Sequence, residues 1–435
     1  TAFDIIKHAE NVFRHSSAQK RTVRRIMVTA EKSRIDCRHI DVLDGIRAVS
    51  VIIVLIFHFW QQTWIFPVIK TPWLAFVGIT KIDFSNFATV GYLFVDMMVL
   101  ISGFLLFLPL MRSIILGEEM SSWKNYARRR IARIVPSYYF AVLLLFFASA
   151  LPTGAYATTA DALKDLFAHL TFTQTLWVNT YIATPLDVVL WTVAIEVWFY
   201  VLFPFVAEFI KGPRNKNRQS FTPAYGIFFI FAVFNIINYV YTENFVLKGN
   251  VYLAMRINQF PAFLGVYSIG MLGASAFVLI AKNCRRSRIF NAVNTLFSVF
   301  SILLIVYLIN DCVATQERQV WQVTERSKLA FVFMTFIITT ALSSKWYRWL
   351  FSNKFMRFLS GISYNLYIWH QWLAVQCKNT WRIPKWSGEI PPNMLNITYW
   401  MNRYAVVITV FAFAASILAT YLIEKPFANL IMGRP

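Results

Sequence analysis

Cysteines and charged residues are scarce in this chain. Only 14% of its 435 residues are charged, whereas a soluble protein of this size has about 25%. Its 4 cysteines lack the spacing of metal ligands and indicate no disulfide framework. Glycine and proline occur 15 times each, which is fewer than we expect of a carrier built from broken helices. These scarcities argue against a soluble enzyme and a disulfide-rich secreted protein, and we expect no bound metal.

Hydrophobic and basic residues, by contrast, are abundant. The chain is 57% hydrophobic, contains 41 phenylalanines, and has a formal net charge of +21. Its mean hydropathy is +0.52. This composition predicts a polytopic membrane protein. A basic chain can bind nucleic acid, but here the positive-inside rule and contact with anionic lipids are the favoured explanations. We therefore expect anionic lipids as partners and no nucleic acid.

Ten apolar segments have roughly the length of a membrane-spanning helix. They are residues 45–64, 90–111, 134–151, 188–210, 223–242, 259–281, 290–309, 328–344, 356–376 and 404–424. With the N-terminus inside, most of the 42 lysines and arginines fall in inner segments. The sequence therefore predicts an all-α, polytopic transmembrane bundle of about ten spans with both termini cytoplasmic.

The chain divides near residue 42. Residues 1–42 form a basic extension, expected in the cytoplasm, in which residues 3–13 have the pattern of an amphipathic helix. A helix lying on the inner leaflet and an ordinary cytoplasmic extension are equally supported. Residues 43–435 form the transmembrane domain.

The first span carries two basic side chains on one face. In "LDGIRAVSVIIVLIFHFW", residues 43–60, Arg47 and His58 are eleven residues apart, so they lie within roughly 20° of each other around a helix and about 16 Å apart along it. With Arg47 at the membrane surface, His58 lies near the bilayer midplane. The alternative interpretation is a positive flank and an interhelical hydrogen-bond partner.

Two later spans also carry polar faces. Glu196 shares a face with Thr192 and Tyr200, and its estimated depth is close to that of His58. We therefore expect the Glu196 carboxylate to pair with the His58 imidazole, although a structural glutamate is equally supported. In the ninth span, Ser363, Tyr367 and His370 form one polar stripe, which a buried structural network explains equally well.

The second span contains two further residues of interest. Asp96 lies near its outer end, where we expect the carboxylate to be solvated. Gly103 is a small residue at which a neighbouring helix or a ligand can approach closely.

An arginine cluster precedes the third span. Arg128, Arg129, Arg130 and Arg133 occur in "NYARRRIARIVPSYYF", and Arg130 and Arg133 share a helix face. Such a cluster at the cytoplasmic surface binds lipid phosphate or a phosphorylated cofactor. On composition alone, lipid contact or membrane topology is favoured.

Taken in order, these motifs resemble the acyltransferase family 3 of integral membrane proteins over residues 43–427. The motifs are "LDGIRAVSVIIVLIFHF" with Arg47 and His58, "FVDMMVLISGFLL" with Ser102 and Gly103, "RRRIARIVPSYY" with Arg130 and Arg133, "WTVAIEVWFYVLFP" with Glu196 and Tyr200, "ISYNLYIWH" ending at His370, and "YLIEKPF" with Glu424. Two features depart from the pattern: Met97 and Met98 replace the usual phenylalanines, and the motifs assign no role to the N-terminal extension.

The resemblance implies transfer of an acyl group, usually acetyl from cytosolic acetyl-CoA, to a hydroxyl of an extracytoplasmic acceptor. Surface glycans are the favoured acceptors, and a bacterial cytoplasmic membrane is the expected location. The resemblance also implies that His58 is essential and that arginines hold CoA. We assign catalysis to His58 and Glu196 and CoA binding to Arg47, Arg129, Arg130 and Arg133. The candidates for binding substrate or the developing oxyanion are Ser102, Tyr200, Tyr367 and His370.

A proton-coupled transporter is the main alternative, because midplane histidine and glutamate also suit a proton relay. The two halves of the sequence show no clear repeat, which such carriers usually have. Turnover of acyl-CoA distinguishes the two functions.

Overall fold

The computed structural model describes residues 35–78, 80–212, 223–248 and 252–433. The predicted amphipathic helix at residues 3–13 lies outside these ranges. The described chain is almost entirely helical, with one two-stranded antiparallel hairpin. The prediction of an all-α transmembrane bundle is therefore confirmed.

Ten long helices occupy the ten apolar segments found in the sequence. They are α3 (Val42–Thr63), α5 (Phe94–Leu116), α6 (Trp123–Leu145), α9 (Trp191–Lys211), α10 (Pro223–Tyr241), α12 (Leu264–Asn283), α13 (Arg288–Ala314), α15 (Arg326–Leu342), α17 (Lys354–Asn379) and α18 (Thr398–Ala419). Short π-helical turns extend three of them: η3 (Phe146–Ala150) after α6, η6 (Thr242–Val246) after α10 and η8 (Thr420–Glu424) after α18.

The number of spans differs from the prediction of about ten. Within the described ranges, eight helices are long and apolar enough to cross a membrane, and a ninth span is counted if α15 and the segment Lys345–Asn379 are joined. These two parts are bent by 115°. Helix α15 has only 17 residues, and α17 carries polar side chains along one face. Ten spans are therefore not confirmed, and the orientation of the termini stays a prediction.

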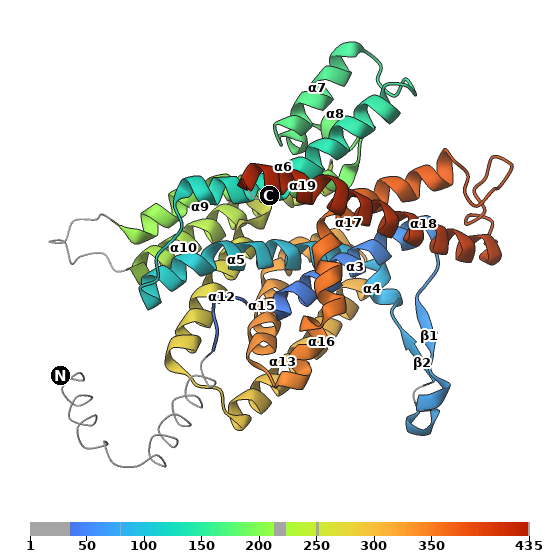
Figure 1. Cartoon of the computed structure of the whole chain (residues 1–435). Coiled ribbons are helices and arrows are strands. Elements are labelled where there is room, and N and C mark those ends of the chain that lie inside the picture. The colour runs from blue at the N-terminus through green and yellow to red at the C-terminus, as the bar shows by residue number, and fades with distance from the viewer. Residues whose placement is uncertain (1–34, 79, 213–222, 249–251, 434–435) are drawn as a thin grey trace, which may run out of the picture.

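Helix α3 lies inside the bundle and packs against α5 and α17, while α5 also crosses α12 (Figure 1). The crossing of α5 and α12 depends on glycine. A Cβ at Gly103 would lie 2.7 Å from the Tyr267 carbonyl oxygen, and one at Gly270 would lie 2.5 Å from that of Leu100. Both contacts are too short for any larger residue, which confirms that a neighbouring helix approaches closely at Gly103.

Shorter elements connect the long helices. The strands β1 (Val68–Lys70) and β2 (Lys81–Asp83) form a hairpin that extends away from the bundle (Figure 1). The segment that contains α7 (Thr159–Leu170) and α8 (Val178–Tyr181) also projects from the bundle, at a different place. The remaining short elements include α4 (Ser85–Thr89), η2 (Gly91–Leu93), η5 (Val188–Leu190), α11 (Leu253–Ile257), η7 (Phe260–Phe263), α14 (Arg318–Thr324), α16 (Lys345–Ser352) and α19 (Lys425–Met432).

Candidate active site

Two histidines from distant parts of the chain are hydrogen-bonded to each other. His370 Nδ1 lies 3.1 Å and 2.8 Å from the carbonyl oxygens of Leu366 and Tyr367. Since a carbonyl only accepts, we assign the proton of His370 to Nδ1. Its Nε2 is then an acceptor and lies 2.9 Å from His58 Nδ1. His58 must donate from Nδ1, which leaves its Nε2 with a free lone pair.

His58 lines a cavity of about 590 Å³. Amide and aromatic side chains make up much of the wall, among them Trp60, Tyr92, Trp191 and Gln371. The helices α8, α11 and α14, which belong to loops predicted to be outside, also contribute residues. The His58 side chain therefore lines a space bounded in part by segments that the sequence predicts to be outside.

Glu196 belongs to a different local network. Its Oε1 accepts a hydrogen bond of 3.2 Å from Ser102 Oγ and a second one from the Tyr200 hydroxyl. Together with Arg47 and Arg133, it lines a narrow cavity of about 60 Å³. The hydrogen bonds described here thus connect Glu196 to α5 and to its own helix.

The pairing of Glu196 with His58 predicted from their depths is therefore absent from the hydrogen bonds of the described residues. His58 bonds to His370 on α17, while Glu196 bonds to Ser102 on α5. Equal depth in a bilayer does not make two side chains neighbours, because the rotation of each helix about its axis decides which helix its polar face meets.

Tyr367 lies between the two cavities. Its side chain lines both of them, as does Val95. The Tyr367 hydroxyl is hydrogen-bonded to Thr192, which belongs to α9. Widening of the contact between these two side chains would join the narrow cavity to the one that contains His58.

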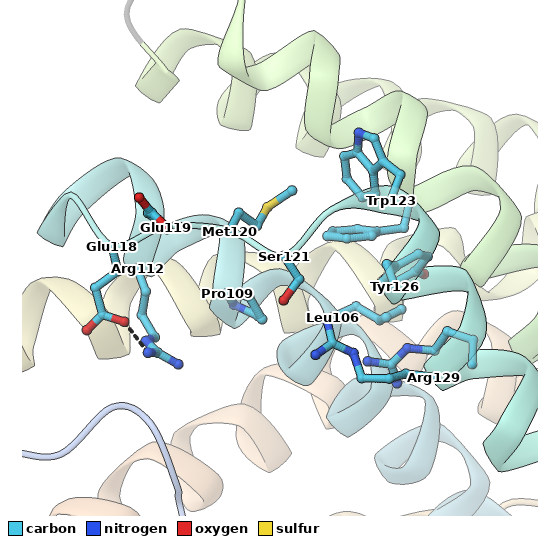
Figure 2. Close-up of a pocket in the computed structure, with 12 residues that line it drawn as sticks. Leu106, Pro109, Arg112, Glu118, Glu119, Met120, Ser121, Trp123, Tyr126 and Arg129 are labelled. Carbon is cyan, nitrogen blue, oxygen red and sulfur yellow. Dashed lines mark hydrogen bonds and ion pairs between the residues drawn. The ribbon is translucent and has the colours of Figure 1, made fainter. Parts of the chain in front are cut away.

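A third cavity, of about 410 Å³, lies where α5 ends and α6 begins (Figure 2). Arg129 and Arg130 line it, as does Arg112, whose charge is balanced by an ion pair with Glu118. Glu119 adds a second carboxylate to the wall. The third cavity is thus a polar site at the end of the bundle predicted to be cytoplasmic.

Arg130 connects the third cavity to the narrow one. Its guanidinium lies 5.1 Å from the centre of the Tyr200 ring and 5.4 Å from that of Tyr126. The Tyr200 hydroxyl in turn donates to Glu196. Arg130 and Arg133 share a face of α6 as predicted, and they line successive cavities.

The ten residues that the sequence analysis assigned to catalysis, CoA binding and substrate or oxyanion binding all line these three cavities or contact residues that do. The narrow cavity contains Arg47, Ser102, Arg133, Glu196 and Tyr367, and the third cavity contains Arg129 and Arg130. The cavity of about 590 Å³, called the outer cavity because the loops that line it are predicted to be outside, contains His58. Tyr200 and His370 contact Glu196 and His58. The structure gives their positions, and their roles stay predictions.

Asp96 corrects the expectation of a solvated carboxylate. It is fully buried, with 0% of its surface exposed, and lies 3.2 Å from Arg326 Nε. Arg326 also donates to the carbonyl oxygens of Ile257 and Ala262, at 3.2 Å and 3.0 Å. Burial demands a counter-charge, and the sequence reasoning missed Arg326 because it stands at the start of a span like an ordinary outer flank.

Comparisons with known proteins identify related chains. The model of a family described as an acyltransferase domain matches residues 40–425. A provisionally named O-acetyltransferase of Staphylococcus aureus (strain COL) is 26% identical over 355 residues, which cover 77% of this chain and 50% of that protein. The O-acetyltransferase OatA of Staphylococcus aureus (strain NCTC 8325) is 28% identical over 201 residues, covering 42% and 28%.

A provisionally named acetyltransferase of Acidianus two-tailed virus is 25% identical over 261 residues, covering 58% of this chain and 65% of the viral protein. The chain spans about half the length of most of the curated relatives with which it was compared. A search of the solved structures found no match.

Proposed function

The chain belongs to the acyltransferase family 3 of integral membrane proteins, and from this premise we propose that it is an O-acetyltransferase. The donor is acetyl-CoA, or another acyl-CoA, on the cytosolic side. The acceptor is a hydroxyl of an extracytoplasmic molecule, with a cell-surface glycan favoured. The observation that carries the proposal is the hydrogen bond between His58 Nδ1 and His370 Nε2 in a histidine that lines the outer cavity, because the tautomer assigned from it leaves His58 Nε2 with a lone pair.

His58 acts as the base in this reaction. The acceptor hydroxyl gives its proton to His58 Nε2 while its oxygen forms a bond to the thioester carbonyl carbon. The tetrahedral intermediate collapses, the carbon–sulfur bond breaks, and the CoA thiolate leaves with the proton returned by the imidazolium. A transient acyl-imidazole uses the same nitrogen as nucleophile, so both routes need the same lone pair.

The arginines bind the donor. Arg129 and Arg130 hold the CoA phosphates at the cavity between α5 and α6. The pantetheine arm passes Arg133 and Arg47 to bring the thioester to His58. A cavity of about 60 Å³ has room for about two waters, so this passage must widen when the donor binds.

Tyr367 is the donor best placed to stabilise the developing oxyanion. It lines the same cavity as His58, and its hydroxyl must give up the hydrogen bond to Thr192 to act on the oxyanion. The hydroxyls of Ser102 and Tyr200 bond to Glu196, away from the cavity that contains His58. We therefore assign Glu196 a positioning role: it orients these two hydroxyls and balances the charge of Arg47 and Arg133 in the narrow cavity.

The test uses the full chain in lipid nanodiscs with radiolabelled acetyl-CoA and a crude membrane glycan fraction. We expect the wild type to release CoA and label the glycan. His58→Ala should abolish transfer yet retain acetyl-CoA binding, and His39→Ala, an exposed histidine away from these three cavities, should remain active. Normal turnover in His58→Ala would refute the catalytic role, and proton-driven uptake without CoA release would favour a transporter.

A further inference from the structure

A fourth cavity, of about 620 Å³, lies at the end of the bundle where α3 begins and α12 and α15 end. It shares no lining residue with the three cavities of the proposed active site. Three basic side chains line it: Arg286 from the connection between α12 and α13, and Lys345 and Arg348 from α16. The positive-inside rule places this end of the bundle at the cytoplasmic surface.

Arg286 and Arg348 lie close enough in this cavity for their charges to interact, and the carboxylate of Asp41 partly offsets the charge of Arg348. Arg286 donates to the carbonyl oxygen of Ala341, at 2.9 Å, at the C-terminal end of α15. Burial, and next the nearby charge of Arg348, lower the pKa of Arg286 to about 10. Arg348 Nε is buried and has no hydrogen-bond partner in the described chain. An anion placed between the two guanidiniums would relieve their repulsion and use the free N–H.

The two carboxylates of the cavity wall interact with residues that are near them in the sequence. Asp36 accepts a 2.7 Å hydrogen bond from the Arg38 backbone N–H, and Asp41 lies 3.4 Å from His39. Neither forms an ion pair within 4.0 Å with Arg286 or Arg348 among the described residues. The cavity wall therefore carries three cationic side chains from one side of the fold, while the segment before α3 contributes two carboxylates and His39.

Exposed aromatic side chains occur on α16, which lines the cavity, and at the start of α17. Trp349 lines the cavity and is 62% exposed, and its neighbour Trp346 on α16 is 66% exposed. Phe355, at the start of α17, is 62% exposed. Tryptophan is enriched at membrane interfaces, where its ring lies at the level of the lipid headgroups. A basic cavity beside exposed tryptophans fits a phosphate that is attached to an acyl chain.

We propose that this cavity binds the phosphate headgroup of an anionic membrane phospholipid. Arg348 and Arg286 hold the phosphate oxygens, Lys345 adds a third positive charge, and Trp346 and Trp349 contact the glycerol and the upper acyl chain. Basic pockets between helices on the cytoplasmic side bind anionic lipid headgroups in this way. The site is separate from the proposed active site, so it does not depend on the proposed function.

The test measures lipid affinity by native mass spectrometry of the delipidated full chain. We expect dioleoyl phosphatidylglycerol to bind more tightly than dioleoyl phosphatidylcholine. Arg348→Gln should weaken phosphatidylglycerol binding at least about tenfold, and Lys345→Gln less. Arg357→Gln, which removes the same charge from an exposed position on α17, is the matched control and should bind like the wild type.

Three results would overturn the proposal. One is equal binding of the two lipids by the wild type, and another is undiminished binding by Arg348→Gln. The third is binding of inorganic phosphate as tight as that of the lipid, which would make this a site for soluble phosphates. Because the Arg348 side chain donates none of the hydrogen bonds found among the described residues, and only its backbone N–H bonds to Ser344, its variant should keep the wild-type Tm without lipid, and the Tm checks that the fold is intact.

Discussion

The contact between His58 and His370 leads to the sharpest prediction. His370 Nε2 accepts from His58 Nδ1 at 2.9 Å, and this bond fixes the tautomer that leaves His58 Nε2 unprotonated. It also stabilises the imidazolium formed in the reaction. His370→Leu leaves the His58 N–H without this acceptor, at a cost of about 1–3 kcal/mol. At about 1.4 kcal/mol for each factor of ten in rate, kcat should fall about 10- to 100-fold.

The assay is the initial rate of CoA release with acceptor present, measured over a range of acetyl-CoA concentrations. The KM for acetyl-CoA should stay unchanged, because the arginines that we assign to CoA lie at other cavities. His370→Gln is the conservative control, since its side-chain oxygen can accept the same proton and should restore part of kcat. A wild-type kcat in His370→Leu would refute the assigned tautomer, and equal losses in both variants would indicate packing alone.

Three further predictions concern charge. Replacing Arg130 and Arg133 together by alanine should weaken acetyl-CoA binding, and the effect should be larger at low salt. Calorimetry at two ionic strengths measures this affinity. An unchanged affinity would mean that the two arginines serve membrane topology or lipid contact instead of CoA binding. Arg326→Met should destabilise the fold by about 3–5 kcal/mol because Asp96 stays buried without its partner, and adding Asp96→Asn should recover much of the lost Tm. Burial raises the pKa of Asp187 to about 7, whereas in the unfolded chain it is about 4. The stability that is fully present below about pH 4 is therefore lost as pH rises to about 7. The Tm should fall between about pH 4 and 7, and Asp187→Asn should flatten this dependence.

The sequence located the elements of this protein well. Each of the ten apolar segments is helical, and the face shared by Arg130 and Arg133 is present as predicted. The stripe of Ser363, Tyr367 and His370 meets the rest of the site, since the first two line the narrow cavity and the third contacts His58. Hydropathy and a 3.6-residue period are local properties of the chain, so they can be determined from the sequence alone.

The number of membrane spans could not be predicted from the sequence with the same success. Helix α15 is short, and α17 is polar on the face that it turns to the site, so length and hydropathy do not settle whether each crosses the membrane by itself. Loops were harder still. The walls of the outer cavity include residues of α11 and α14, and such short elements have no periodic pattern that would mark them as part of a site.

Only the tertiary structure decided which polar groups meet. His58 and His370 are 312 positions apart, Asp96 and Arg326 are 230 apart, and Ser102 and Glu196 are 94 apart. The sequence indicated that His58 and Glu196 lie at depths where charge is costly, and hence that each needs a partner, but it predicted a solvated Asp96 and did not identify Arg326. The choice of partner depends on how each helix is rotated and on the close crossing of α5 and α12 at glycine, which are set by packing across the whole bundle.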